Sequence, residues 1–131
     1  TATRGYVDFL DLGGHIRHQD LNPNLIRRYL KKGIPILTGL SATYLYRCVR
    51  EAPETEKDDD VGGEPVGHFV VLSGYERESR SVHVADPMAD NPTEGHYYTQ
   101  GIDHLICSIL LGIMTYDANL LVIEPRKPRD A

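Results

Sequence analysis

Two apolar runs separated by a polar turn make up the stretch GEPVGHFVVLSGYERESRSVHVADP, residues 63–87. Each run has the length of a strand, and the turn YERES (75–79) between them is short, which is the pattern of a β-hairpin. His68 begins the first run and Asp86 ends the second, directly before a proline. Because a hairpin brings these two ends together, this stretch bears on both the fold and the candidate site.

The register of this hairpin decides which side chains meet. With the turn centred near Arg77, residues equally distant from it pair: His68 with Asp86, Val70 with Val84 and Leu72 with Val82. Since side chains alternate along a strand, these six share one face of the sheet. The opposite face carries Phe69, Val71, Ser73, His83 and Ala85. A slip of one residue would exchange the two faces, so the register is a testable prediction.

The predicted neighbours His68 and Asp86 have the chemistry of a base and its orienting carboxylate. Directly opposed residues have Cβ atoms roughly 4.5–5.5 Å apart, within reach of a hydrogen bond between imidazole and carboxylate. A carboxylate that binds one ring nitrogen selects the tautomer and leaves the other nitrogen free to accept a proton. Pro87 ends the strand ladder and keeps this end of the sheet accessible. The alternative is a pair of surface side chains that caps the strand ends without a catalytic role.

The rest of the sequence supplies helices and further strands. Asn22, Pro23 and Gly33 have the positions of the N-cap, first residue and C-terminal glycine of one helix. IPILTGL (34–40) predicts a short buried strand. SATYLYRCVRE (41–51) is compatible with a strand or a short helix, and the helix is favoured. The other predicted elements are an acidic loop at 51–67, a strand at 96–100, a helix at 101–114 and a strand at 119–125. Two or three helices around a mostly antiparallel sheet make an α+β domain.

Composition and charge exclude several classes of protein. A chain of 131 residues makes one domain and is long enough for a core of its own. Its net charge of -5 and scattered basic residues argue against a nucleic-acid partner. The most apolar run, LICSILLGIM (105–114), is too short to cross a bilayer, and no signal segment opens the chain. Residues 1–14 carry no signature of a helix start.

Neither a metal nor a cofactor is predicted. Cys48 and Cys107 are too few for a disulfide framework and lack zinc spacing, so both are interpreted as ordinary thiols that are buried or half-buried. This cysteine usage gives a reducing compartment, the cytoplasm, as the default location. The acidic run 58–60 lacks the spacing of a calcium loop. His15 and His18 fall in an expected strand or loop, where residues three apart point to opposite faces.

The succession of GIPILTGL, an acidic loop, GHFVVLSGY and VHVADP resembles the bacteriocin-leader-processing (double-glycine) cysteine peptidases and their relatives. The resemblance covers residues 22–90, approximately. It implies a papain-like fold in which the histidine of the Gly-His-hydrophobic run is the general base and the aspartate of the Asp-Pro pair orients it. Carried over to this sequence, His68 is the catalytic base and Asp86 its orienting residue, with a peptide as substrate.

The nucleophile of that family has no counterpart in this sequence. The family's cysteine begins a helix well upstream of the histidine, and a glutamine before it completes the oxyanion hole. Here Gln19 is not followed by such a cysteine, Cys48 lies too close before His68, and Cys107 follows both partners. Activation of Cys48 by His68 across the acidic loop is one further alternative.

Two explanations for the missing cysteine stay open. In the favoured one, residues 1–131 are the C-terminal, sheet-bearing part of a larger catalytic domain whose other part supplies cysteine and glutamine. In the second, the cysteine has been lost and the domain is an inactive module that binds peptides in the same cleft. A half-fold exposes the apolar face meant for the missing helices, so we expect this chain to form a homodimer or to exchange elements.

Overall fold

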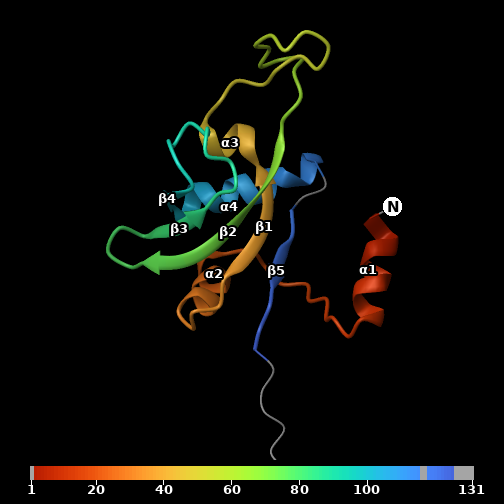
Figure 1. The fold of residues 1–131 in the computed structure, drawn as a ribbon, viewed down its shortest axis with the longest axis vertical. Coiled ribbons are helices and arrows are strands. Elements are labelled where there is room, and N and C mark those ends of the chain that lie inside the picture. Colours follow the sequence, from red (N-terminus) through yellow and green to blue (C-terminus); the bar gives the residue numbers. More distant parts are fainter. Residues whose placement is uncertain (1, 116–117, 126–131) are drawn as a thin grey trace, which may run out of the picture.

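The computed structural model describes residues 2–115 and 118–125, which form a five-stranded antiparallel sheet with four α-helices. The predicted α+β class is therefore confirmed. The strands lie in the order β4-β3-β2-β1-β5 (Figure 1). They are β1 (Ile36–Ser41), β2 (Gly67–Glu76), β3 (Ser81–Ala85), β4 (Tyr97–Gly101) and β5 (Leu120–Val122). The helices are α1 (Ala2–Asp11), α2 (Pro23–Leu30), α3 (Ala42–Tyr46) and α4 (Ile102–Leu111), which a 3₁₀ turn, η1 (Gly112–Thr115), continues.

Local capping signals account for where α2 and α3 begin. The side chain of Asn22 accepts a hydrogen bond from the backbone N–H of Leu25, which satisfies one of the free donors at the start of α2. Gly33, just past the helix end, has φ +71°, a conformation that glycine adopts without strain. Ser41 caps α3 in the same way by accepting from Tyr44 N. The predicted helix at 22–33 and the favoured helical alternative after Ser41 are both confirmed.

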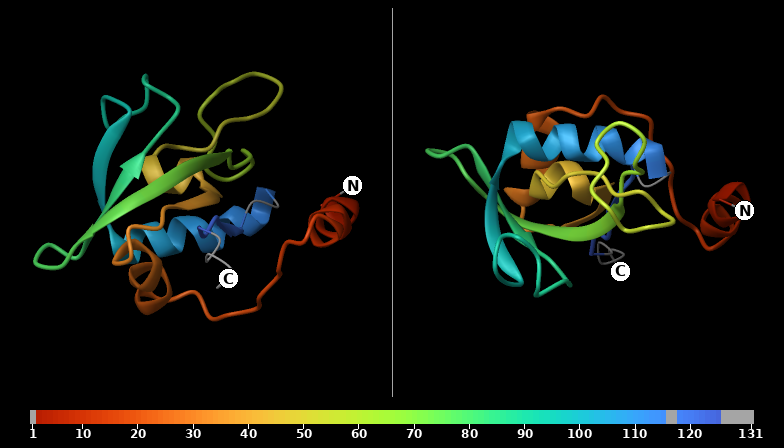
Figure 2. Two further views of the ribbon diagram at one scale, coloured as in Figure 1. Left: turned by 60° about the horizontal axis from the view of Figure 1, so that its bottom comes forward. Right: turned by 90° about the horizontal axis from the view of Figure 1, so that it is seen from above.

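One face of the sheet is covered by α2, α3 and α4, and the core lies between the two layers (Figure 2). Fully or almost fully buried side chains from both layers fill it: Ile26, Leu30, Ile36, Leu40, Leu45, Val70, Leu72, Val82, Val84, Ile102, Leu105 and Ile109. At the end of α4 a Cβ on Gly112 would lie 3.0 Å from the Cα of Leu40, so glycine permits this close approach to β1. No helix in the described part of the chain is long and apolar enough to cross a membrane.

The hairpin forms as predicted, but the predicted register is wrong by two residues. Leu72 pairs with Val84, not with Val82. The turn lies later in the sequence than expected, at residues 77–80 with Arg80 at φ +52°, and a β-bulge between Leu72 and Gly74 changes the register by one residue between the turn and the site. Because the error near the site is an even number of residues, each side chain stays on its predicted face. The inward face is therefore confirmed, although the partners along it differ.

Helix α1 was not expected, since residues 1–14 carry no helix-start signal. Tyr6, Val7 and Leu10 give this helix an apolar side, which stays largely exposed. The helix stands away from the sheet and its covering helices in both views of Figure 2. Tyr6 Oη donates a hydrogen bond of 2.8 Å to Oδ1 of Asn119, just before β5.

The acidic segment forms the predicted loop between α3 and β2. Its end, just before His68, contacts the first residues of α3. Ala42 N donates to Val66 O at 2.8 Å, and Val66 N donates to Oγ1 of Thr43 at 3.0 Å. Strand β2 begins at Gly67, directly after these contacts. The start of β2 and the short helix α3 are thereby held side by side.

Candidate active site

His68 and Asp86 are in direct contact, as the sequence predicted. His68 Nε2 lies 2.8 Å from Oδ1 of Asp86. His68 is the second residue of β2, and Asp86 directly follows β3. Continuing the observed pairing of Val71 with Ala85 places Asp86 beside Val70, so the imidazole and the carboxylate meet along a diagonal. Diagonal neighbours in a sheet are about 7–8 Å apart at the backbone, a gap that two polar side chains can bridge.

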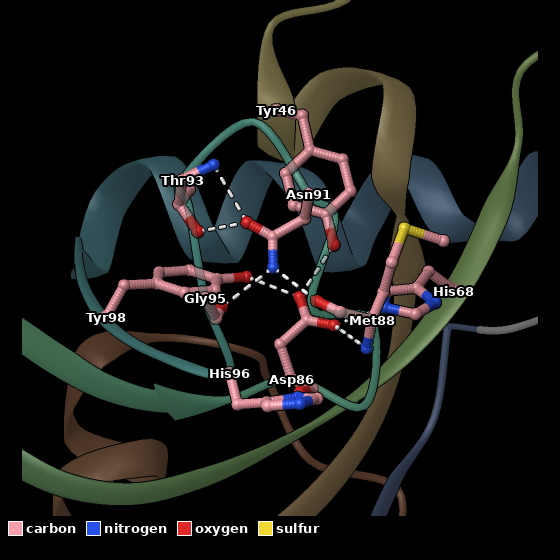
Figure 3. A network of polar contacts seen from close by, with 9 residues as sticks. All are labelled: Tyr46, His68, Asp86, Met88, Asn91, Thr93, Gly95, His96 and Tyr98. Atoms are coloured by element: carbon pink, nitrogen blue, oxygen red, sulfur yellow. Dashed lines mark hydrogen bonds and ion pairs between the residues drawn. The ribbon is translucent and has the colours of Figure 1, made fainter.

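Four donors surround the carboxylate of Asp86 (Figure 3). Its Oδ1 accepts from His68 Nε2 and, at 2.9 Å, from the backbone N–H of Met88. Its Oδ2 accepts from the hydroxyls of Tyr46 at 2.6 Å and Tyr98 at 2.8 Å. These donors come from β2, the segment after β3, α3 and β4, so four parts of the chain converge on one side chain.

The surroundings of Asp86 keep it ionised. Burial by itself raises the pKa of this carboxyl, but the hydrogen bonds from Tyr46, His68, Met88 N and Tyr98 outweigh it and hold the pKa below its ordinary value. The two tyrosines respond in the opposite sense. Burial, followed by the hydrogen bond to Asp86, raises the pKa of Tyr46 and of Tyr98 well above the usual value. Both phenols therefore stay protonated and act as donors.

The tautomer of His68 follows from this arrangement. An ionised carboxylate can only accept, so Nε2 carries the proton and the lone pair lies on Nδ1. Nδ1 has no hydrogen-bond partner among residues 2–115 and 118–125. The side chain of His68 is 15% exposed and that of Asp86 is 0% exposed, so solvent and ligands reach the imidazole but not the carboxylate.

The loop after Asp86 is closed by a reciprocal contact with His96. Asp86 N donates to His96 O at 2.7 Å, and His96 Nδ1 donates to Asp86 O at 2.8 Å. Inside the loop, the side chain of Asn91 is 4% exposed and donates to the carbonyls of Met88 and Gly95. This internal scaffold holds the backbone of residue 88 where it can donate to Asp86.

A scan against protein families matched residues 7–104 to the Peptidase_C39 like family, which is well over half of the chain. The chain belongs to the Peptidase_C39 like family. Searches of the curated proteins and of the solved structures gave no match. The resemblance to leader-processing cysteine peptidases is thus confirmed at the level of the family, and the chain is a peptidase-related domain.

Neither cysteine of this Peptidase_C39 like chain contacts His68. Cys48 is exposed just after α3, and its Sγ donates only to the carbonyl of Tyr46, at 3.8 Å. Cys107 is exposed on α4, whereas Leu105 and Ile109 of that helix are buried in the core. The predicted burial of the two cysteines is therefore wrong, because Cys48 lies past the end of α3 and Cys107 lies on the solvent side of α4. The alternative in which Cys48 is activated by His68 has no supporting contact in the described part of the chain.

One cavity among the described residues does not include the pair of His68 and Asp86. Its volume is about 790 Å³, and it is lined by Ser41, Thr43, Tyr44, Arg47, Cys48, Arg50, Asp60, Pro65, His104, Leu111 and Met114. Its ion pair joins Arg50 to Asp60. Among residues 2–115 and 118–125, no three His, Cys, Asp or Glu side chains are grouped so as to hold a metal ion.

Sequence reasoning missed Tyr46 and Tyr98 as partners of Asp86. For Tyr98 a signal existed, because a strand beside the hairpin places every second residue on the inward face. Tyr98 pairs with the buried Val84, whereas Tyr97 is 84% exposed. For Tyr46 no comparable signal existed, since its position depends on how α3 packs against the sheet.

Proposed function

We propose that this chain supplies the general base and its orienting carboxylate to a papain-like cysteine peptidase that cleaves a peptide or related acyl bond. One observation carries the proposal: buried Asp86 holds His68 at Nε2 and leaves Nδ1 free at a partly exposed position. Membership of a peptidase-related family supports it.

His68 would act on both proton transfers of the reaction. Nδ1 takes the proton of a thiol, and the resulting thiolate attacks the acyl carbon of the substrate. Asp86 stabilises the imidazolium that forms, because its carboxylate stays ionised beside Nε2. The imidazolium then returns the proton to the leaving amine, which leaves a thioester that water hydrolyses.

The nucleophile in this proposal comes from outside the given chain. Cys48 hydrogen-bonds to a backbone carbonyl and Cys107 lies on the solvent side of α4, so neither is positioned for the reaction. We therefore propose that residues 1–131 are the sheet-bearing part of a larger catalytic domain, whose other part brings a cysteine to Nδ1 of His68.

A second candidate is a catalytically inactive module that binds peptides on the same fold. What favours it is the lack of any thiol in contact with His68 among residues 2–115 and 118–125. In that case the pair of His68 and Asp86 is a structural or recognition element only.

Alkylation of the complete protein at about pH 6 distinguishes the two candidates. An ordinary thiol is almost wholly protonated at this pH and reacts slowly, whereas a thiol activated by His68 is a thiolate and reacts quickly. Cys48 and Cys107 are first replaced by serine to remove background. One remaining thiol is expected to react quickly with iodoacetamide. In His68→Ala its rate should fall at least about tenfold, because the thiolate loses its imidazolium partner.

His83→Ala is the matched control, since His83 lies in the same hairpin on the opposite, exposed face. It should leave the rate unchanged. If no thiol in the complete protein responds to His68, the catalytic proposal is wrong and the peptide-binding candidate replaces it.

We also propose that the chain by itself self-associates. The outer face of its sheet carries Leu37, Phe69 and Leu121, which are 39%, 51% and 39% exposed. Leu37 pairs directly with Leu121, so these side chains form a continuous apolar surface with Phe69 on the neighbouring strand. Such a surface favours a homodimer.

A further inference from the structure

Oδ2 of the Asp86 carboxylate accepts hydrogen bonds from two tyrosine hydroxyls. Tyr46 reaches Oδ2 from the end of α3, and Tyr98 reaches the same oxygen from β4 (Figure 3). Their Oη–Oδ2 distances are 2.6 Å and 2.8 Å, within the range of strong hydrogen bonds to an ionised acceptor. Phenylalanine fills nearly the same volume, so packing alone does not require these two hydroxyls.

With both tyrosines in place, the hydrogen-bonding capacity of the carboxylate is used up. An ionised carboxylate offers about four lone-pair sites. Two are taken by the tyrosines on Oδ2, and two by His68 Nε2 and Met88 N on Oδ1. The donors on Oδ2 prevent the group from rotating and leave no site for a proton. Oδ1 therefore remains turned toward the imidazole.

We propose that Tyr46 and Tyr98 are positioning residues: they hold Asp86 as a fixed carboxylate, which keeps the proton of His68 on Nε2 and leaves Nδ1 free as the base. The inference rests on the proposed catalytic role of His68. Neither tyrosine touches the reacting atoms, and both act through Asp86.

Removal of the two hydroxyls has a predictable electrostatic effect. The titratable groups that face Asp86 are Tyr46 of α3, His68 of β2, Tyr98 of β4 and His96, which contacts the backbone carbonyl. Burial raises the pKa of the Asp86 carboxyl, and the tyrosines are two of the donors that reverse this. Without them the pKa of Asp86 rises, and the carboxylate is free to rotate away from Nε2 of His68.

The test compares Tyr46→Phe, Tyr98→Phe and the double variant with the unchanged chain. The ¹³C resonance of the Asp86 carboxyl reports its titration, and the ¹⁵N resonances of the His68 ring report the tautomer. We expect the midpoint for Asp86 to move to higher pH in each single variant and further in the double variant. At neutral pH the share of the Nε2–H tautomer of His68 should fall in the variants, because the carboxylate is no longer held toward the ring.

Two neighbouring tyrosines serve as matched controls. Tyr97→Phe changes the exposed neighbour of Tyr98 on β4, and Tyr44→Phe changes a residue of α3 that stacks on His104. Neither variant should alter the titration of Asp86 or the tautomer of His68.

The outcomes distinguish the two proposals. Folded phenylalanine variants with an unchanged Asp86 titration and an unchanged His68 tautomer would show that the tyrosines only pack, which overturns this inference. An Nδ1–H tautomer in the unchanged chain overturns the proposed role of His68 itself. If the phenylalanine variants fail to fold, hydroxyl proton exchange is measured in the chain without substitutions. The hydroxyl protons of Tyr46 and Tyr98 should exchange slowly with solvent, and rapid exchange of both overturns the inference.

Discussion

Asp86 connects the stability of this domain to its chemistry. It is a buried carboxylate whose four hydrogen-bond partners are all donors. Within residues 2–115 and 118–125, its charge is compensated by these hydrogen bonds and by no lysine or arginine side chain. Charge-assisted hydrogen bonds of this kind are stronger than neutral ones. The same bonds that stabilise the anion also fix the imidazole of His68.

Asp86→Asn is expected to lower the free energy of unfolding by on the order of 3 kcal/mol at neutral pH. The amide has nearly the same shape, but its NH₂ group faces donors in either orientation, toward the tyrosines or toward His68 and Met88 N. Urea unfolding measures the loss, and Asp90→Asn, at an exposed neighbouring position, is the control.

The pH dependence of this loss follows from the lowered pKa of Asp86. Its folded-state pKa lies below the unfolded one, so its contribution to stability is complete above the unfolded pKa and disappears as pH falls through the folded pKa. The stability difference between the unchanged chain and Asp86→Asn should therefore shrink in acid. A difference that stays constant from neutral pH into strong acid would contradict the assignment.

The loop from Pro87 to Gly95 is ordered by its own side chains. Asn91 accepts from the backbone N–H and the hydroxyl of Thr93 and donates to two carbonyls, so one buried amide satisfies several backbone groups of the loop. Because Met88 N is one of the donors to Asp86, the loop belongs functionally to the candidate site.

Asn91→Ala is expected to loosen this loop and to lower the free energy of unfolding by about 1–3 kcal/mol, because the carbonyls of Met88 and Gly95 lose their donor. Amide hydrogen exchange should show lost protection at Met88, with core strands β1 and β2 little affected. Asp90→Ala, whose side chain is exposed, is the matched control. Equal protection at Met88 in Asn91→Ala and in the unchanged chain would contradict the role given to Asn91.

The domain as a whole has one covered and one open sheet face. Helices α2, α3 and α4 cover the inner face (Figure 2). The outer face and α1 carry exposed apolar side chains. Large apolar surfaces seldom stay free on a monomer in water, because covering them is favourable by about 25 cal/mol per Å².

Sedimentation of the isolated chain is therefore expected to give a mass that rises with concentration toward that of a dimer. Phe69→Ser should shift this equilibrium toward the monomer by removing the most exposed of the three apolar side chains on the outer face. His83→Ser, which changes an exposed polar residue on the same face, should not. A concentration-independent monomer mass for the unchanged chain would contradict self-association.

Alternation and capping within short segments were sufficient to predict much of this domain. The α+β class, the cap at Asn22 and the contact between His68 and Asp86 all follow from residues near one another in sequence. The prediction of this contact was correct although the predicted register was wrong by two residues. An even error leaves each side chain on its predicted face, and two polar side chains can meet along a diagonal.

Contacts between segments that are distant in the sequence could not be predicted from local patterns. The bulge after Leu72, the position of Tyr46 and the docking of the loop onto Asp86 depend on how turn length and core packing place whole elements against one another. Neighbouring residues encode periodicity and caps, because these arise from backbone geometry within a few residues. Which hydroxyl reaches a carboxylate forty residues away is settled only when the packed core fixes α3, β2 and β4 together.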